Sequence, residues 1–155
     1  MIGETKRPVR FVIAGDGPAR AEWEGKIAQE PWKHHVTLLG HRADVPNLLA
    51  SLDVLVLPSY AHEGIPQIIL QAQAMSRAVV ATTIGGIPEV VEDGVTGLLI
   101  PPRDAVALAE KISLLLNDPA LSAQLGRAAH LSIEKNFSLD AMGERLLALY
   151  EKLSR

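Results

Sequence analysis

Short apolar runs alternate with helical patterns along the first two thirds of the chain. The uninterrupted runs predict strands at 9–14, 35–40, 53–59, 78–82 and 97–101. Runs of this kind are typical of parallel strands that are buried on both faces. Helical periodicity lies between them and the connections are short, which predicts an α/β fold: a parallel β-sheet of five strands with helices on both faces.

Beyond Pro102 the pattern becomes purely helical. Asp104, Asp118 and Ser138 stand where three successive helices are expected to begin, because their side chains can accept a hydrogen bond from the first helical turn. The last helix carries apolar residues at intervals of 3, 4, 3 and 4, namely Leu139, Met142, Leu146, Leu149 and Leu153. This amphipathic stripe requires a covering surface. We expect that surface to belong to this sheet, to polypeptide outside the chain or to a second copy.

Composition narrows the class of protein. The 155 residues are 48% apolar and 21% charged with a formal charge of −3, which fits a single globular domain over 1–155 and no nucleic-acid partner. There is no cysteine, so disulfides and thiolate chemistry are excluded. No apolar run approaches the ~18 residues of a membrane span, and the amino-terminal segment lacks the apolar core of a signal peptide. We therefore expect no transmembrane segment and a cytoplasmic location.

The turn "GDGP" follows the first expected strand and precedes a helix. Backbone N–H groups of Gly15 and Gly17 would point there toward a phosphate, aided by the helix dipole. The turn lacks the third glycine of a dinucleotide fingerprint and the lysine of a P-loop. A plain tight turn is the alternative interpretation.

The segment "SYAHEGIPQ" follows the most strand-like run of the chain. Pro66 suits the first turn of a helix, so the N–H groups of Gln67 and Ile68 would face an anion, and Gly64 permits close approach of a ligand. Glu63 can accept hydrogen bonds from hydroxyl groups. The alternative is that Glu63 only complements the helix dipole, worth about 0.3–1 kcal/mol.

Two further features bear on this edge of the sheet. Gln71 and Gln73 occupy different faces of the following helix, so one is expected in solvent and the other can direct its amide into a cleft. Gly85 and Gly86 form a third strand-to-helix loop, for which simple helix capping is the alternative. Three such loops along one sheet edge predict an extended cleft for a ligand with a central diphosphate.

The histidines give no metal-ligand spacing. There are five, at positions 34, 35, 41, 62 and 130, and they do not form a His-x-x-x-His pair or a Ser-His-Asp set. We expect no metal site. His41 and His62 are placed near the edge of the cleft, where surface polar residues are the simpler interpretation.

The ordered motifs as a whole resemble a known family. The run "GDGP … LLGHRADVPNLLASLDVLVLPSYAHEGIPQIILQAQAMSRAVVATTIGGIPEVVEDGVTGLLIPPRD" is similar to the carboxyl-terminal, donor-binding half of retaining GT-B glycosyltransferases, in particular glycosyltransferase family four, also called glycosyl transferases group 1. The resemblance covers about 9–103. It implies a Rossmann-like domain that binds a nucleotide-diphosphate sugar, in a parent enzyme that transfers a hexose-type sugar with retention and without a metal or other cofactor.

The resemblance also assigns roles to residues. It implies that Glu63, at the catalytic position, contacts hydroxyls of the donor sugar, and that backbone N–H groups around Gly64, Ile65 and Gln67 hold sugar hydroxyls and diphosphate. A second family glutamate, which bonds the ribose, is replaced here by Gln71. A neutral amide makes a weaker bond than a carboxylate, because the charge assistance is lost.

The neighbouring loops complete the implied donor site. The segment from Gly40 to Arg42 resembles the part that lines the base. The Gly15–Gly17 and Gly85–Gly86 loops are expected along the same edge of the sheet, and so along the same cleft. These residues, with Ile68, are therefore included among the candidate donor-binding positions.

The resemblance further implies that some parts of the family's structure are missing from this chain. The family begins this domain with another strand and helix that carry an Arg and a Lys for the diphosphate, and Lys6, Arg7 and Arg10 do not stand in that context. An amino-terminal acceptor-binding domain is expected as well. We therefore expect a fragment that is inactive in isolation. The alternatives are a non-catalytic nucleotide-binding or assembly module and a nucleotide-sugar epimerase-like domain, against which the Glu63 loop argues.

Overall fold

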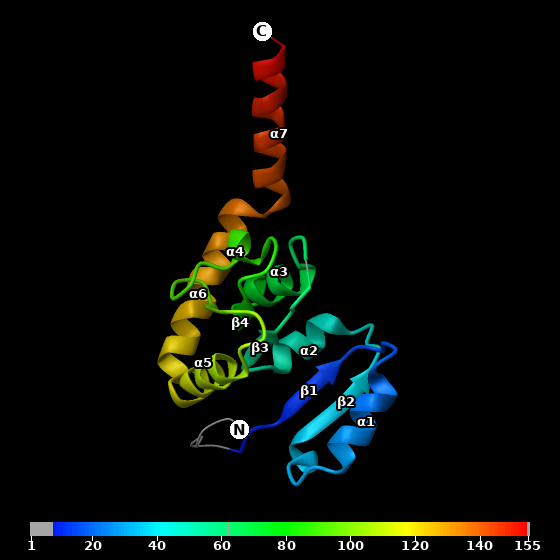
Figure 1. Cartoon of the computed structure of the whole chain (residues 1–155). Coiled ribbons are helices and arrows are strands. Elements are labelled where there is room, and N and C mark those ends of the chain that lie inside the picture. The colour runs from blue at the N-terminus through cyan, green and yellow to red at the C-terminus, as the bar shows by residue number, and fades with distance from the viewer. Residues whose placement is uncertain (1–7, 62, 155) are drawn as a thin grey trace.

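The computed structural model describes residues 8–61 and 63–154 (Figure 1). Lys6, Arg7 and His62 lie outside the described residues. The elements are, in chain order, β1 (Phe11–Ala14), α1 (Arg20–Ala28), the 3₁₀ turn η1 (Lys33–His35), β2 (Val36–Gly40), α2 (Val45–Ser51), β3 (Val54–Leu57), α3 (Gln67–Ala74), β4 (Ala78–Thr82), α4 (Ile87–Val90), β5 (Leu98–Ile100), α5 (Ala105–Asn117), α6 (Pro119–Asn136) and α7 (Leu139–Leu153). All five expected strands are present, and every pairing between them is parallel.

The five strands form two sheets, whereas the sequence predicted one. β1 pairs with β2, and β3, β4 and β5 form a separate sheet in that order. β1 therefore pairs on one side only within the described chain, and so does β3. The expected α/β class with parallel strands is nevertheless confirmed.

The larger sheet holds the core. Every residue of β4 is buried, as expected for a central parallel strand. Val79 and Ala81 pack on one face in a cluster with Ile69 of α3 and Ile87 of α4. Ala78 and Val80 pack on the other face, with side chains of α5 and α6. Helices thus cover both faces of this sheet.

The three expected helix starts after Pro102 are confirmed by their caps. The Asp104 side chain accepts from the Ala107 N–H at 2.8 Å, and the Asp118 side chain accepts from the Leu121 N–H at 3.0 Å. The Ser138 hydroxyl accepts from the Ala141 N–H at 3.2 Å. Each cap satisfies an N–H that has no partner within its helix.

The last helix projects away from the rest of the chain (Figure 1). None of its residues is buried, and the predicted apolar stripe is exposed, from 47% at Leu146 to 81% at Leu139. The sheet of this chain therefore does not cover α7. The expectation that a second copy or other polypeptide covers it stays a prediction. No helix in the described part of the chain is long and apolar enough to cross a bilayer.

We predict that Gly126→Ala destabilises the protein. Gly126 is buried in α6 and faces the turn between α3 and β4, where an added β-carbon would overlap the Ser76 carbonyl oxygen. The crowding should lower the free energy of unfolding by about 1–3 kcal/mol, measured by urea denaturation. The matched control is Gly143→Ala in exposed α7, where a β-carbon meets no atom within 4 Å. This control should gain up to about 1 kcal/mol from helix propensity, and equal effects of the two changes would contradict the close packing.

Candidate functional site

The loop after β3 packs directly against the loop after β4. The Gly86 N–H donates to the Glu63 carbonyl oxygen at 3.1 Å. Gly85 has φ +56°, and an added β-carbon there would overlap that same carbonyl oxygen. At Gly86 a β-carbon would lie 2.9 Å from the Gly64 carbonyl oxygen. The structure therefore brings together the two glycines and the Glu63–Gly64 pair, which the sequence had placed in separate loops.

Two hydroxyl groups, those of Ser59 and Thr82, position the Glu63 side chain. The Ser59 hydroxyl donates to Glu63 Oε1 at 2.5 Å. The carbonyl of Ser59 accepts in turn from the Thr82 hydroxyl at 2.7 Å, and Thr82 is only 1% exposed at the end of β4. The carboxylate is thus oriented from the ends of two neighbouring strands. Sequence reasoning missed these hydroxyls, whose only signal was a Ser and a Thr directly after apolar runs.

The start of α3 follows this carboxylate. Pro66 precedes the helix and provides no side-chain cap, and its carbonyl accepts from the Ile69 N–H at 3.1 Å. Gln67 is exposed and Ile65 is 39% exposed, so both are open to a ligand. The helix therefore begins next to Glu63 with its positive end at the same edge of the sheet.

The two glutamines of α3 have different surroundings. Gln73 is fully buried, and its amide nitrogen donates to the Val90 carbonyl at 3.0 Å and the Thr96 carbonyl at 3.3 Å. It therefore ties α3 to the segment between α4 and β5. Gln71 is exposed. One of the two glutamines is therefore in solvent, as expected, while the buried one bonds to backbone carbonyls and not to a cleft. That Gln71 contacts a ligand stays a prediction.

A second group of candidate residues lies at the ends of β1 and β2. The Gly15 N–H donates to the Gly40 carbonyl at 2.8 Å, and the Gly17 carbonyl accepts from the Arg20 N–H at 3.0 Å. Gly40 has φ +68°, and the Arg20 guanidinium lies where its β-carbon would be. Hydrogen bonding to Glu24 at 2.8 Å raises the pKa of Arg20, and Asp16 lies 3.6 Å away. Arg20 is a cation at this turn that the sequence analysis missed.

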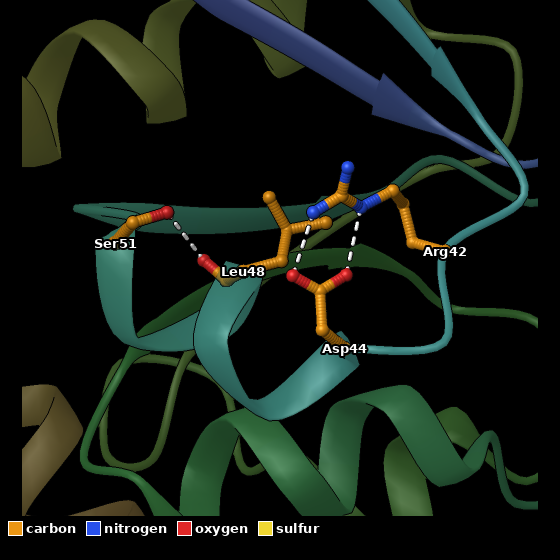
Figure 2. A network of polar contacts seen from close by, with 4 residues as sticks. All are labelled: Arg42, Asp44, Leu48 and Ser51. Carbon is orange, nitrogen blue, oxygen red and sulfur yellow. Dashed lines mark hydrogen bonds and ion pairs between the residues drawn. The ribbon is translucent and has the colours of Figure 1, made fainter.

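Arg42 is held by its neighbour. Figure 2 shows the guanidinium bonded to both oxygens of Asp44, at 2.7 and 2.6 Å. These hydrogen bonds lower the pKa of Asp44. Asp44 precedes α2 but makes no side-chain cap, because its carboxylate pairs with Arg42. At the other end of α2 the Ser51 hydroxyl donates to the Leu48 carbonyl at 2.7 Å (Figure 2). In this structure the Arg42 guanidinium therefore forms a bidentate pair with Asp44.

A large cavity separates the two groups of residues. It has a volume of about 1410 Å³, and its lining includes Gly15 and Arg42 from one group and Ile68 from the other. Glu63 lies in a smaller hollow of about 390 Å³ with Ser59 and Tyr60. The candidate residues thus form two clusters, and the large cavity reaches Gly15 and Arg42 of one and Ile68 of the other.

Another cation missed by the sequence analysis reaches this edge. The Arg103 guanidinium lies over the ring of Tyr60, 5.4 Å from the centroid. Arg103 follows β5 and has φ +62°, an uncommon conformation for a residue with a β-carbon. The segments that follow β3 and β5 thereby come into contact, and Tyr60 lines the same hollow as Glu63. No group of three potential metal ligands lies within residues 8–61 and 63–154.

Comparison with known proteins gives consistent matches. The family model described as Glycosyl transferases group 1 matches residues 2–118. An alpha-D-kanosaminyltransferase of Streptomyces kanamyceticus is 33% identical over 149 residues, which are 95% of this chain and 38% of that protein.

Solved structures match over most of the chain. HepE of Anabaena in complex with UDP superposes with a TM-score of 0.85 at 27% identity, covering 93% of this chain and 41% of that one. A second structure of HepE contains UDP-glucose. The C-terminal domain of a glycosyl transferase group 1 family protein from Francisella tularensis has a TM-score of 0.70 at 26% identity, covering 77% of this chain and 63% of that domain. The chain spans about two fifths of the full-length relatives.

We predict that Gly85→Ala displaces the Glu63 loop. Gly94→Ala is the matched control, because Gly94 also has a positive φ, +74°, but has open space around its β-carbon position. Both changes should cost about 1–2 kcal/mol of stability for the left-handed backbone. Gly85→Ala should cost about 1–3 kcal/mol more through the clash with Glu63, and should shift the amide signals of Glu63 and Gly86. Unchanged signals at these two residues would contradict the contact.

Proposed function

This chain belongs to the glycosyl transferases group 1 family, and on that basis we propose that it forms the nucleotide-sugar-binding domain of a glycosyltransferase. The observation that carries the proposal is the contact of the Glu63–Gly64 loop with Gly85–Gly86, at the carboxyl ends of neighbouring parallel strands. Ligands of open α/β sheets bind at that edge. Structures of HepE with UDP and with UDP-glucose support a ligand of the same class.

Each part of the site has a role in this proposal. Glu63, held by Ser59, accepts hydrogen bonds from the hydroxyls of the donor sugar. The N–H groups of Gly64, Ile65 and Gln67, at the positive end of α3, hold the diphosphate. Exposed Gln71 bonds the ribose.

The second cluster completes the donor site. Gly15, Gly17 and Gly40 bring backbone close to the nucleotide, and Arg42 lies beside the base. Since its guanidinium is paired with Asp44, Arg42 contributes a fixed planar surface as well as charge. Ile68 also lines the cavity and offers an apolar contact there.

The whole protein is proposed to transfer the sugar to an acceptor with retention of configuration. Helix dipoles and cationic side chains take the place of a metal in this scheme. Acceptor binding belongs to polypeptide outside this chain, and the chain alone is proposed to be inactive. The cytoplasmic location remains a prediction.

A non-catalytic nucleotide-binding module is the second candidate, and one observation favours it. Gln71 is neutral where the resemblance calls for a glutamate, and it is exposed at the position proposed for the ribose. An amide still donates and accepts hydrogen bonds, so binding can persist while affinity falls. Activity restored by the acceptor-binding part would separate the two candidates.

We predict that Glu63→Gln weakens binding of UDP-glucose but not of UDP. The lost charge-assisted hydrogen bonds to the sugar are worth about 1.5–3 kcal/mol, or roughly 10-fold to 100-fold in Kd. Both ligands would be titrated into labelled chain while amide shifts are followed at residues 63–65, 67–68 and 85–86, with ADP-glucose and GDP-glucose to identify the base.

The matched control for this titration is Glu110→Gln on the exposed side of α5, which removes the same charge away from the site. It should leave both affinities unchanged. If the Glu63 variant lost equal affinity for UDP and for UDP-glucose, the proposed contact of Glu63 with the sugar would be contradicted. If no nucleotide bound, the proposal that the chain alone forms a donor site would be contradicted.

We also predict that Gln71→Glu tightens binding of UDP and UDP-glucose by the same factor. A carboxylate at this position should strengthen the bond to the ribose, which both ligands contain, by about 1 kcal/mol or roughly fivefold. Gln124→Glu on exposed α6 adds the same charge elsewhere and is the control. A tighter complex with UDP-glucose alone would place Gln71 near the sugar instead.

A further inference from the structure

Three arginines lie near the carboxyl ends of strands, and they differ in their partners. Arg20 and Arg42 are each paired with carboxylates of neighbouring residues. Arg103 has no carboxylate partner among the described residues and donates no hydrogen bond to them, and its contact is the ring of Tyr60. Of these three cations, Arg103 is therefore the one whose N–H groups are free for a ligand.

The contact between Arg103 and Tyr60 crosses the edge of the larger sheet. Arg103 follows β5 and Tyr60 follows β3, and β4 lies between these two strands. The two side chains therefore meet across the end of β4. The Thr83 N–H donates to the Ile100 carbonyl at 2.9 Å and so ties β4 to β5 at this same end. The guanidinium thus lies at the carboxyl edge, where parallel sheets bind ligands.

The backbone at Arg103 is held in an uncommon conformation. Its φ of +62° lies in the left-handed region, which disfavours any residue with a β-carbon. The next residue, Asp104, is fixed because its side chain caps α5. Such conformations persist where the surrounding structure imposes them, and they concentrate at ligand sites. A glycine would fit this turn without strain, yet an arginine occupies it.

The hollow beside this contact contains a carboxylate that does not pair with Arg103. Tyr60 and Glu63 both line the hollow of about 390 Å³. Glu63 accepts a hydrogen bond from the Ser59 hydroxyl. The site therefore has a carboxylate that suits hydroxyl groups and, stacked on a lining residue, a guanidinium that suits an anion. A ligand with both hydroxyl groups and negative charge matches this pair.

We propose that Arg103, held by the Tyr60 ring, is a specificity-determining residue that binds an anionic group of the donor beside the Glu63 hollow. This inference rests on the proposed donor site. The planar guanidinium matches two oxygens of a phosphate or carboxylate, and stacking on an aromatic ring orients it. The diphosphate and a carboxylate on the transferred sugar offer the same chemistry, and the experiment distinguishes these two sources.

The test is a titration of the labelled full chain with pyrophosphate, UDP, UDP-glucose, UDP-glucuronate and uridine. Arg103→Gln removes the charge and should weaken binding of the ligands that present the anion about tenfold, because charge-assisted hydrogen bonds are lost. Uridine carries neither anion, so its affinity should not change. The matched control is Arg127→Gln on the exposed side of α6, which should leave every affinity unchanged.

The pattern of losses identifies the anion. Equal losses for pyrophosphate, UDP and UDP-glucose would assign Arg103 to the diphosphate. A loss for UDP-glucuronate alone would assign it to a carboxylate on the sugar. In either case, added salt should weaken binding to the unchanged protein more than binding to Arg103→Gln, because salt screens the attraction between charges.

Two further variants separate binding from folding. Arg103→Gly fits the left-handed backbone and should keep the midpoint of urea denaturation, yet weaken binding as much as Arg103→Gln. Tyr60→Leu removes the ring that orients the guanidinium and should weaken the same ligands by a smaller factor. Tyr150→Leu on exposed α7 is its control and should have no effect on binding.

Three results would overturn the proposal. If Arg103→Gln bound every ligand as tightly as the unchanged protein, Arg103 would have no role in binding, while the donor-site proposal would stand. If Arg103→Gln weakened uridine as much as UDP, its effect would be on the structure of the site and not on an anion. If the unchanged protein bound none of the five ligands, the donor-site proposal for the chain alone would fail together with this one.

Discussion

The backbone contact between the loops after β3 and β4 sets the geometry of the candidate site. Thr82 ends β4 and holds the Ser59 carbonyl, Ser59 holds the Glu63 carboxylate, and the Glu63 carbonyl accepts from Gly86. These bonds join two loops whose strands are already fixed by the buried pairing of β3 with β4. The position of Glu63 therefore follows from the best-packed part of the core, which gives a loop residue the precision that a binding site requires.

The sequence predicted the strands and the last three helices because their signals are local. Apolar runs marked the strands, and Asp104, Asp118 and Ser138 marked helix starts with side chains that do cap them. The separation into two sheets was not predictable in this way. Strand runs such as those of β1 and β3 have the same apolar pattern whether one or both edges are paired. Pairing depends on which strands meet in space, and the apolar run of one strand does not indicate which strands will lie beside it.

The candidate site was predictable in its loops but not in its contacts. Glu63, Gly64 and the Gly85–Gly86 pair were identified from turn chemistry, yet nothing in their spacing required Gly85 to face the Glu63 carbonyl. The same limit applies to Gln73, whose buried bonds to Val90 and Thr96 cross 17 and 23 residues. Helical phase separated it from Gln71 without showing which of the two was buried. Arg42 was placed correctly in its loop, but its pairing with Asp44 became evident only with side chains in place.

The open cavity relates the two clusters of the site to each other. Gly15 follows β1 and Arg42 follows β2, whereas Ile68 lies in α3, which packs on the β3–β5 sheet. All three residues line the same space. The hydrogen bonds within each sheet fix the spacing of its own strands at about 4.7–4.9 Å. Within the described residues no pairing joins β1 to β3, so no strand pairing sets the distance between the two clusters. A ligand that contacts both clusters would therefore order one sheet relative to the other, and the entropy lost in this ordering would weaken its binding.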